Sequence, residues 1–438
     1  MSGSPLGIGE PGSTPHLAGV TVAALRGVRL PDGTLDDVLI ADGQVVSSRI
    51  APEAPTPTGT DLDATGWRVL PAACEPHAHL DKALTAERLG PDAGNDLLAA
   101  IEQWRAMQPG VDAADLAARA LAAIGLYVPR GITTIRSHAD VPQDGDRFRS
   151  VDALIALREQ LRGRVTLQVC LLAGAEVDDD LVEEALARGV DVVGGCPHLA
   201  PDPRREVTRM LDAAQRHGLP VDLHADEQTD VTPPEDTFDV VELARQVLER
   251  GMDRPGWVTA SHCVRLGVLP PERLTPVLEL VARARVGIVA LPITNLYLQG
   301  RGRTHSAPRA LTALRAALEA GVPLAAGGDN LRDPFNPTGR ADPFETTSLL
   351  MTAGHLGGDA ALAAVTGGAR TVLGLPAAGP YPGQRADLLL VPDVDLGTVL
   401  AGAVDARIVL HGGRVVADTR TARALDLPTA HPPPALVR

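Results

Sequence analysis

The chain has 438 residues, of which 45% are hydrophobic and 22% charged, and its formal net charge is −15 at pH 7. This length can bury a large core and fits two or three ordinary domains, or one large barrel with an accessory module. Only 2% of the residues are aromatic, so no basic surface with interleaved rings exists on which nucleic-acid bases could stack. Composition and charge therefore exclude a nucleic-acid partner.

Membrane association and secretion are equally disfavoured. No apolar run reaches the roughly eighteen residues that a membrane span requires, and no basic cluster indicates a membrane surface. The first residues, MSGSPLGIGEPGSTPH, lack the basic and apolar regions of a signal peptide. The four cysteines are far apart and form no CxxC pair; they are Cys74, Cys170, Cys196 and Cys263. The sequence predicts a reduced, cytoplasmic protein with buried thiols.

In chain order, residues 1–17 are rich in Gly, Pro and Ser and predict a disordered tail. Residues 18–68 contain short β-branched runs separated by turn signals such as Asp42-Gly43, which indicate a small β module. The same pattern returns in residues 380–425, and a loose tail follows at 426–438. We expect the two β segments to pair into one β-sandwich built from both chain ends.

Residues 69–379 show a different period, in which apolar strand-like runs alternate with Ala/Leu/Arg-rich helical stretches. This alternation indicates an α/β fold with a parallel sheet covered by helices. Eight strand candidates over roughly 310 residues fit a (β/α)8 TIM barrel with insertions. The candidates are residues 69–75, 133–138, 165–171, 191–195, 220–224, 257–262, 286–291 and 323–328. The predicted helices include residues 112–127, 150–161, 180–188, 203–217 and 308–320.

Ionisable residues close several of these strands. The first strand runs into His77 and His79, which lie at i and i+2, so that in an extended segment both imidazoles point to one side and can reach one cation about 2 Å away. Three further strands end in His224, His262 and Asp329. Polar residues at strand ends also occur without a metal. Because the C-terminal ends of barrel strands converge on the active site, the set as a whole predicts a metal centre there.

These residues resemble the amidohydrolase superfamily, and within it the cytosine deaminase-like enzymes; the chain is also similar to triazine hydrolases of the N-isopropylammelide isopropylaminohydrolase type. The resemblance spans residues 69–339 and the flanking β-sandwich. The matching motifs are EPHAHLD (75–81), GITTIRSHADV (131–141), DVVGGCPH (191–198), HADE (224–227), VTASH (258–262), LQGR (298–301) and GGDNLRDPFNPTG (327–339).

The resemblance implies that one divalent metal ion, Zn²⁺ or Fe²⁺, is held by four ligands with a position left for water. The implied ligands are His77, His79, His224 and Asp329. Glu227 matches the proton shuttle, and His262 with Asp329 would polarise the substrate or orient the hydroxide. The fourth strand has no lysine to form the bridging carbamate of binuclear members, so one metal is expected. The alternatives are hydrogen-bonded barrel residues without metal, and a core histidine at position 262.

Four positions bear on the substrate. Ala173 replaces the glutamine that reads the pyrimidine edge in cytosine deaminase, and Asn330 replaces a second aspartate. Phe335 stands where the family has a tryptophan that covers the base; it and Phe344 fall on one predicted loop, where Phe335 is either a ring cover or a loop anchor. Lys82 is either a solvated loop residue or a contact for an anionic group. His138 and His198 match family positions without an assigned role.

The resemblance implies a metal-dependent hydrolytic deaminase of a small N-heterocycle, a cytosine-like pyrimidine or a related amino-substituted ring, in which metal-bound hydroxide attacks and ammonia leaves. The altered pocket residues make cytosine itself the less favoured substrate. The alternatives are an amidohydrolase that releases an alkylamine from a substituted triazine or opens a cyclic amide, and a non-catalytic metal- or ligand-binding barrel. The expected partner is a small molecule, and relatives often form homo-oligomers.

Overall fold

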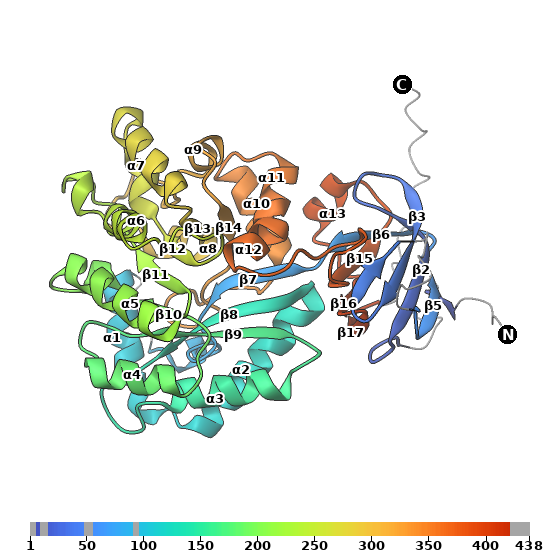
Figure 1. Cartoon of the computed structure of the whole chain (residues 1–438), viewed down its shortest axis with the longest axis horizontal. Coiled ribbons are helices and arrows are strands. Elements are labelled where there is room, and N and C mark those ends of the chain that lie inside the picture. The colour runs from blue at the N-terminus through green and yellow to red at the C-terminus, as the bar shows by residue number, and fades with distance from the viewer. Residues whose placement is uncertain (1–5, 9–15, 48–55, 91–95, 421–438) are drawn as a thin grey trace.

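The computed structural model describes residues 6–8, 16–47, 56–90 and 96–420. Figure 1 shows two neighbouring parts: a larger part in which helices surround parallel strands, and a smaller part made of strands from early and late in the chain. The α/β prediction is confirmed. Among the described residues, no helix combines the length and apolar character that crossing a bilayer requires.

Eight parallel strands form the centre of the larger part. β7 (Ala73–Ala78), β8 (Ile132–Asp140) and β9 (Thr166–Leu172) make a three-stranded sheet. A five-stranded sheet contains β10 (Val193–Gly195), β11 (Val221–Ala225), β12 (Val258–His262), β13 (Gly287–Ala290) and β14 (Leu324–Ala326). Parallel bridges join Ala173 to Gly195 and Ala78 to Asp329. Neighbouring strands can therefore be followed from β7 to β14 and back, in the predicted order.

Helices connect and cover these strands. They are α1 (Leu97–Met107), α2 (Ala113–Tyr127), α3 (Arg149–Gln160), α4 (Asp179–Ala187), α5 (Pro203–His217), α6 (Asp239–Glu249), α7 (Pro271–Arg283), α8 (Pro292–Leu298), α9 (Leu314–Glu319), α10 (Pro343–Thr352), α11 (Gly358–Val365) and α12 (Gly367–Val372). α5 shows the local causes: the Asp202 side chain accepts the Arg205 N–H, Pro203 occupies the first turn, and Gly218 ends the helix with a left-handed φ of 64°.

The predicted helix over residues 308–320 is corrected to the short α9. Residues 308–313 are not helical, because their backbone packs directly against Gly267. A Cβ atom on Gly267 would lie 1.7 Å from the Leu311 carbonyl oxygen. This tertiary contact outweighs the helix propensity of the segment.

The smaller part is one nine-stranded sheet. Its strands are β1 (Leu6–Gly7), β2 (Val22–Arg29), β3 (Leu35–Ala41), β4 (Gln44–Val46), β5 (Thr60–Asp63), β6 (Trp67–Pro71), β15 (Leu388–Pro392), β16 (Ile408–His411) and β17 (Arg414–Asp418). β6 pairs antiparallel with β15, with Val69 opposite Leu390, so early and late segments do pair. The described strands belong to one hydrogen-bonded sheet, and the pairings do not show the two stacked sheets of the predicted sandwich.

Two predicted boundaries change. The first strand candidate, residues 69–75, is split between β6 of the smaller part and β7 of the larger part. Within the predicted tail 1–17, Leu6–Gly7 form β1, and Ile8 and Leu17 are buried, because these apolar residues join the core of the nine-stranded sheet. Residues 1–5 and 9–15 of that tail, and all of 426–438, lie outside the described residues.

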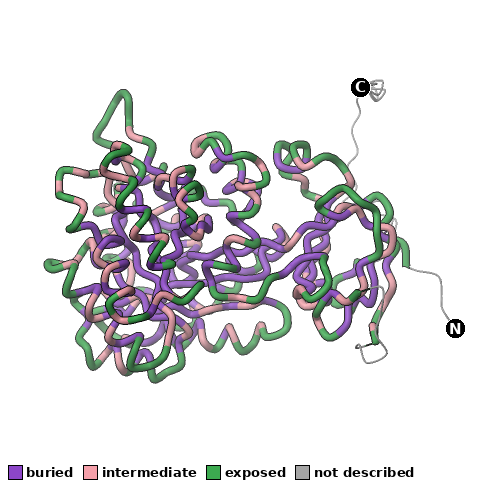
Figure 2. The backbone as a smooth tube through the Cα atoms, turned by 45° about the horizontal axis from the view of Figure 1, so that its top comes forward, coloured by how far each residue is buried: buried purple, intermediate pink, exposed green. Residues whose placement is uncertain are grey.

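Each part has its own apolar core, and the buried backbone in Figure 2 runs through the middle of both. An ion pair joins the two parts. Arg407, next to β16, is fully buried and donates to the Asp342 carboxylate at the start of α10 at 2.9 Å. The same guanidinium donates to the Arg130 carbonyl at 2.6 Å. The larger part is thus held against the smaller one by a buried charge pair with several hydrogen bonds.

Candidate active site

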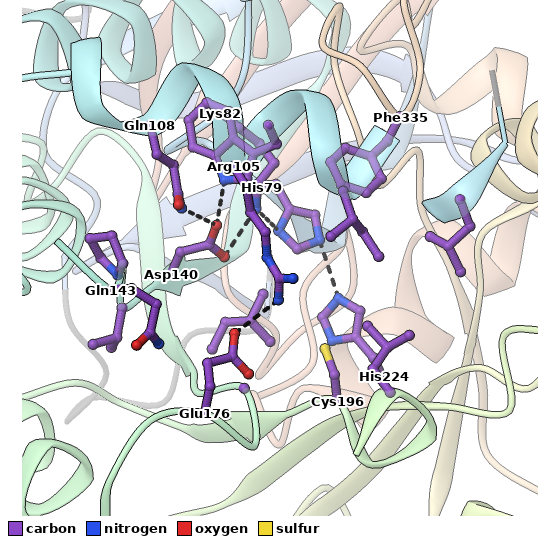
Figure 3. Close-up of a pocket in the computed structure, with 18 of the residues that line it drawn as sticks. His79, Lys82, Arg105, Gln108, Asp140, Gln143, Glu176, Cys196, His224 and Phe335 are labelled. Atoms are coloured by element: carbon purple, nitrogen blue, oxygen red, sulfur yellow. Dashed lines mark hydrogen bonds and ion pairs between the residues drawn. The ribbon is translucent and has the colours of Figure 1, made fainter. Parts of the chain in front are cut away.

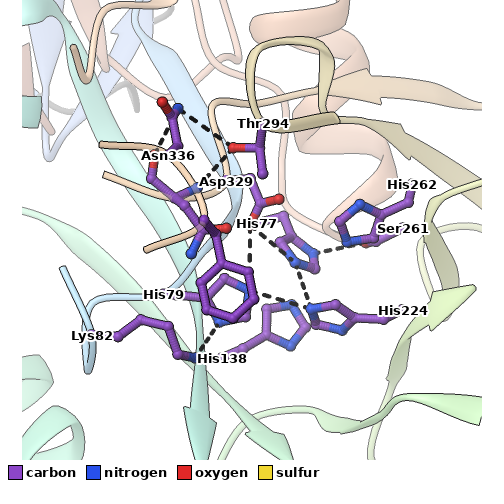
Figure 4. A network of polar contacts seen from close by, with 12 residues as sticks. His77, His79, Lys82, His138, His224, Ser261, His262, Thr294, Asp329 and Asn336 are labelled. Atoms are coloured by element: carbon purple, nitrogen blue, oxygen red, sulfur yellow. Dashed lines mark hydrogen bonds and ion pairs between the residues drawn. The ribbon is translucent and has the colours of Figure 1, made fainter. Parts of the chain in front are cut away.

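Three imidazoles and a carboxylate meet at the C-terminal ends of the strands (Figure 4). His77 Nε2 lies 3.1 Å from His224 Nε2, and His79 Nε2 lies 3.3 Å from the same atom. Asp329 Oδ1 lies 3.3 Å from His79 Nε2 and 3.8 Å from His77 Nε2. All four side chains are buried. The structure therefore brings together the four residues that the sequence nominates as ligands.

This donor set fits one small divalent cation. Two ligand atoms that each lie about 2.1 Å from one ion are about 3.0 to 3.4 Å apart, close to three of the four separations given above. Burial, followed by neighbouring imidazoles, holds the pKa values of His77 and His224 well below the usual value, so both rings are neutral, as metal ligands must be. Burial and the carboxylate of Glu227 raise the pKa of Asp329, and its Oδ1 has no hydrogen-bond donor among the described residues. A cation is the partner that this oxygen lacks.

His77 also lies within reach of a shared cation together with His224 and His262, and a second grouping joins it to His138 and Asp222. There the Asp222 Oδ2 atom already accepts a hydrogen bond from the buried Arg136 guanidinium at 2.9 Å. A guanidinium in contact with the same carboxylate opposes the binding of a second cation. The His138 ring instead lies against His77, with the ring centroids 4.0 Å apart.

The buried Glu75 side chain packs against Gly327 and Gly328, the two residues that precede Asp329. Its carboxylate accepts the Gly328 N–H at 2.8 Å and thereby ties β7 to the segment after β14. A Cβ on Gly327 would lie 2.0 Å from a Glu75 carboxylate oxygen, so no side chain fits there. Burial raises the pKa of Glu75 to about 8. Asp329 itself has a left-handed φ of 66°, which this packing supports.

Glu227 lies between two histidines beside the cluster. His198 Nε2 is 3.4 Å from Glu227 Oε2, and His262 Nδ1 is 3.7 Å from Oε1. Burial alone would raise the pKa of Glu227, but His262 and His198 outweigh it and hold the pKa below its usual value. His198 Nδ1 donates to the His224 carbonyl at 3.0 Å, which fixes the ring. The site therefore contains a buried carboxylate that is kept ionised.

A cavity of about 340 Å³ opens onto this cluster. Its lining includes Glu227, His262 and Asp329. Figure 3 shows His79 and His224 at this cavity, together with Arg105 of α1. Arg105 of α1 reaches across the mouth to Glu176, with the charged atoms 3.0 Å apart. This volume suits a small ligand rather than a polymer.

Some of the predicted substrate-binding residues line the cavity, and Ala173 does not. Phe335 and Asn330 line the cavity, and the Asn330 amide donates to Asp333 at 2.8 Å. Ala173 is fully buried and does not line it, whereas its neighbours Leu172, Gly174 and Ala175 do. Phe344 is not on the loop that carries Phe335; it is buried in α10.

Lys82 lines the cavity but is buried rather than solvated. Its Nζ lies 3.1 Å from Asp140 Oδ1, 3.1 Å from His79 Nδ1 and 3.4 Å from Asp81 Oδ1. Burial would lower the pKa of Lys82, but Asp140 and Asp81 outweigh it and raise the pKa. The ammonium thus pairs with the carboxylates of Asp140 and Asp81, and these contacts order the wall of the cavity.

Sequence reasoning did not nominate the residues that surround Lys82. Trp104 Nε1 of α1 donates to Asp140 Oδ2 at 2.6 Å, and Gln108 donates to the same oxygen at 3.3 Å. The indole and Phe335 lie on either side of the ammonium, 5.6 and 5.9 Å from it. The available signal was Trp104 itself, one of three tryptophans in a chain poor in aromatic residues.

The fold and this site, with its cluster of His and Asp side chains that could hold a metal ion, are those of a hydrolase of the amidohydrolase class. The model of the Amidohydrolase family matches residues 106–417. The chain belongs to this family.

Within this family, the chain is similar to two enzymes of known activity. The pterin deaminase of Rhizobium rhizogenes (strain K84) is 31% identical over 409 residues, which are 91% of each chain. The N-isopropylammelide isopropyl amidohydrolase of Pseudomonas sp. (strain ADP) is 25% identical and covers 81% of this chain and 87% of its own.

Among solved structures, 5-methylcytosine deaminase from Klebsiella pneumoniae with 5-fluorocytosine matches with a TM-score of 0.81 at 25% identity. The match covers 93% of this chain and 99% of the other. N-isopropylammelide isopropylaminohydrolase from Burkholderia multivorans matches with a TM-score of 0.77 at 27% identity and covers 92% and 99%. The chain is thus an amidohydrolase-superfamily enzyme whose deaminase relatives act on C–N bonds.

Proposed function

We propose that the protein is a metal-dependent deaminase of a small amino-substituted N-heterocycle, which adds water to the carbon bearing the amino group and releases ammonia. The convergence of His77, His79, His224 and Asp329 next to an ionised Glu227 is the observation that carries this proposal. The similarity to deaminases of pterin and of 5-methylcytosine supports the type of substrate.

The four converging side chains would hold one Zn²⁺ or Fe²⁺ ion. When bound, such an ion lowers the pKa of a coordinated water from near 15.7 toward about 7. We propose one ion rather than two, because Arg136 already holds Asp222 in the second grouping.

Glu227 would move the protons. Its carboxylate, kept ionised by His198 and His262, accepts a proton from water and delivers it to a ring nitrogen of the substrate. His262 accepts from the Asn295 amide at 3.1 Å through Nδ1, which leaves Nε2–H to donate to the oxygen that adds to the ring. Asp329 would assist at the same oxygen.

The substrate would occupy the 340 Å³ cavity between the cluster and α1. Phe335 and Trp104 supply apolar faces for a flat ring, and Asn330 borders the reacting end. Lys82 would act on the substrate indirectly, because its ion pairs with Asp140 and Asp81 order the wall of the cavity. We further propose that residues 69–379 act as a (β/α)8 barrel, with the segments 18–68 and 380–425 as its accessory β domain.

A second candidate reaction uses the same residues to release an alkylamine instead of ammonia. The similarity to two N-isopropylammelide hydrolases, at 25% and 27% identity, supports it. Incubation of the enzyme with aminopyrimidines, pterins and alkylamino-triazines, read by ammonia against alkylamine release, separates the two reactions.

The test of the metal centre is the double variant His77→Ala/His79→Ala. We expect it to lose bound metal, measured by elemental analysis, together with all turnover of the substrate found in the screen. The variant Glu319→Gln, on an exposed side chain, is the control and should keep both. Turnover at the wild-type rate in the double variant would overturn the proposal.

A further inference from the structure

A line of buried polar contacts leads away from His77, behind the metal-binding cluster. His77 Nδ1 lies 2.9 Å from Ser261 Oγ (Figure 4), and the Ser261 hydroxyl donates to Asp222 Oδ1 at 2.7 Å. The other Asp222 oxygen accepts from Arg136 Nη1 at 2.9 Å. All four side chains are at most 1% exposed. The line thus runs through the strands β7, β12, β11 and β8 without contact with water.

The direction of each hydrogen bond in this line is determined. Arg136 can only donate, and Asp222 as a carboxylate can only accept. The single Ser261 hydroxyl proton therefore points to Asp222. If it pointed elsewhere, a lone pair of the hydroxyl would face the carboxylate oxygen at 2.7 Å, which is repulsive. Ser261 must then accept from His77, so the proton of the neutral His77 ring is on Nδ1. The Nε2 lone pair is left free, and this is the atom that faces His224 and Asp329.

We propose that Asp222 and Ser261 are positioning residues that select the metal-binding tautomer of His77. The inference rests on the proposed metal centre and adds residues that do not touch the metal or the substrate. The register of the sheet builds the line, because Ser261 pairs with His224 across β12 and β11, two residues beyond Asp222. Outer-shell partners of this kind typically change metal affinity by about 10- to 100-fold.

Asp222→Asn is the sharpest test because it reverses the direction of the hydrogen bonds between Asp222, Ser261 and His77. Arg136 requires an acceptor, so the amide oxygen turns to Arg136 and the amide N–H₂ turns to Ser261. Ser261 then donates to His77 Nδ1, and the His77 proton moves to Nε2, where it opposes metal binding. We expect Zn²⁺ affinity, measured by competition with a chromogenic chelator, to fall about 10- to 100-fold. Ser261→Ala removes the acceptor without reversing the line and should cost less.

The control is Asp342→Asn, which breaks a comparable buried aspartate–arginine pair, with Arg407, at the contact between the two parts of the molecule. It should lower the melting temperature yet leave Zn²⁺ affinity unchanged. If Asp222→Asn and Ser261→Ala bind Zn²⁺ as tightly as Asp342→Asn, the inference is wrong.

A second readout uses the metal-free protein and does not depend on the proposed reaction. In ¹⁵N-histidine spectra, the His77 signals, assigned by their loss in His77→Gln, should show Nδ1–H in the wild type and Nε2–H in Asp222→Asn. Nε2–H in the wild type would overturn the inference even if the enzyme binds metal. Wild-type protein with Nδ1–H but no metal affinity would instead overturn the proposed function. If Asp222→Asn does not fold, Ser261→Ala should show loss of the Nδ1–H preference.

Discussion

Glu227 is a buried carboxylate that lies between His198 and His262, and its hydrogen bond and charge outweigh burial and raise the pKa of His198. We expect Glu227→Gln to keep its metal, since Glu227 is not among the converging ligands, and to lose about 10²- to 10⁴-fold in kcat, the usual contribution of general acid–base catalysis. Elemental analysis and steady-state kinetics on the same preparation measure both quantities. A variant that loses metal and activity in parallel would show that Glu227 acts on the metal site instead.

Phe335 and Phe344 are nine positions apart but lie in different surroundings. Phe335 lines the cavity, whereas Phe344 is buried in α10 with the Arg407 guanidinium 4.4 Å from its ring centre. Removing the ring from Phe335 costs the aromatic part of ring stacking, about 0.5–1.5 kcal/mol. Phe335→Leu should therefore raise KM about 2- to 10-fold with a smaller change in kcat. Phe344→Leu should leave KM unchanged and lower the melting temperature; equal KM effects would contradict this assignment.

At the level of elements, the close approach of Gly267 to Leu311 predicts a stability effect far from the site. A methyl group on Gly267 would lie 1.7 Å from a backbone oxygen, so the chain must move. We expect Gly267→Ala to lower the free energy of unfolding by about 1–3 kcal/mol, as overpacking does. Gly125, exposed in the last turn of α2, has no atom within 4 Å of a built Cβ. Gly125→Ala should stabilise by about 1 kcal/mol through helix propensity; urea denaturation measures both.

The strands were predictable because each is a short apolar run that recurs with helices between, and a residue such as His224 or Asp329 marks its C-terminal end. The four proposed ligands could be found for the same reason: their spacing is local, and barrel topology brings strand ends together. α1 could not be predicted, because its apolar face turns toward a cavity that exists only in the fold. Trp104 and Gln108, which lie around Lys82 and Asp140, were missed for that reason. The start of α9 could not be predicted either, because it depends on the contact of Leu311 with the distant Gly267.

For the whole molecule, Arg407 provides a buried polar contact between the two parts. It is fully buried, pairs with Asp342 and donates to the Arg130 carbonyl. Arg407→Ala leaves the buried Asp342 carboxylate paired with the half-exposed Arg130 guanidinium at 2.9 Å, so the loss should be smaller than the cost of about 3–5 kcal/mol for a buried charge without a partner. We expect a corresponding fall in the free energy of unfolding. Arg315→Ala, which removes an exposed arginine, should change it by less than about 0.5 kcal/mol.

The pairing of β6 with β15 also has a consequence for how the protein is made. Val69 leaves the ribosome long before Leu390, its partner, has been synthesised. During that interval β6 is an edge strand with an unpaired row of backbone groups, the kind of edge that other chains can join. The eight-stranded part can form first, since its strands pair mostly with near neighbours in sequence. Completion of the nine-stranded sheet must wait for the last part of translation, when a nascent chain is most exposed to aggregation and most in need of chaperones.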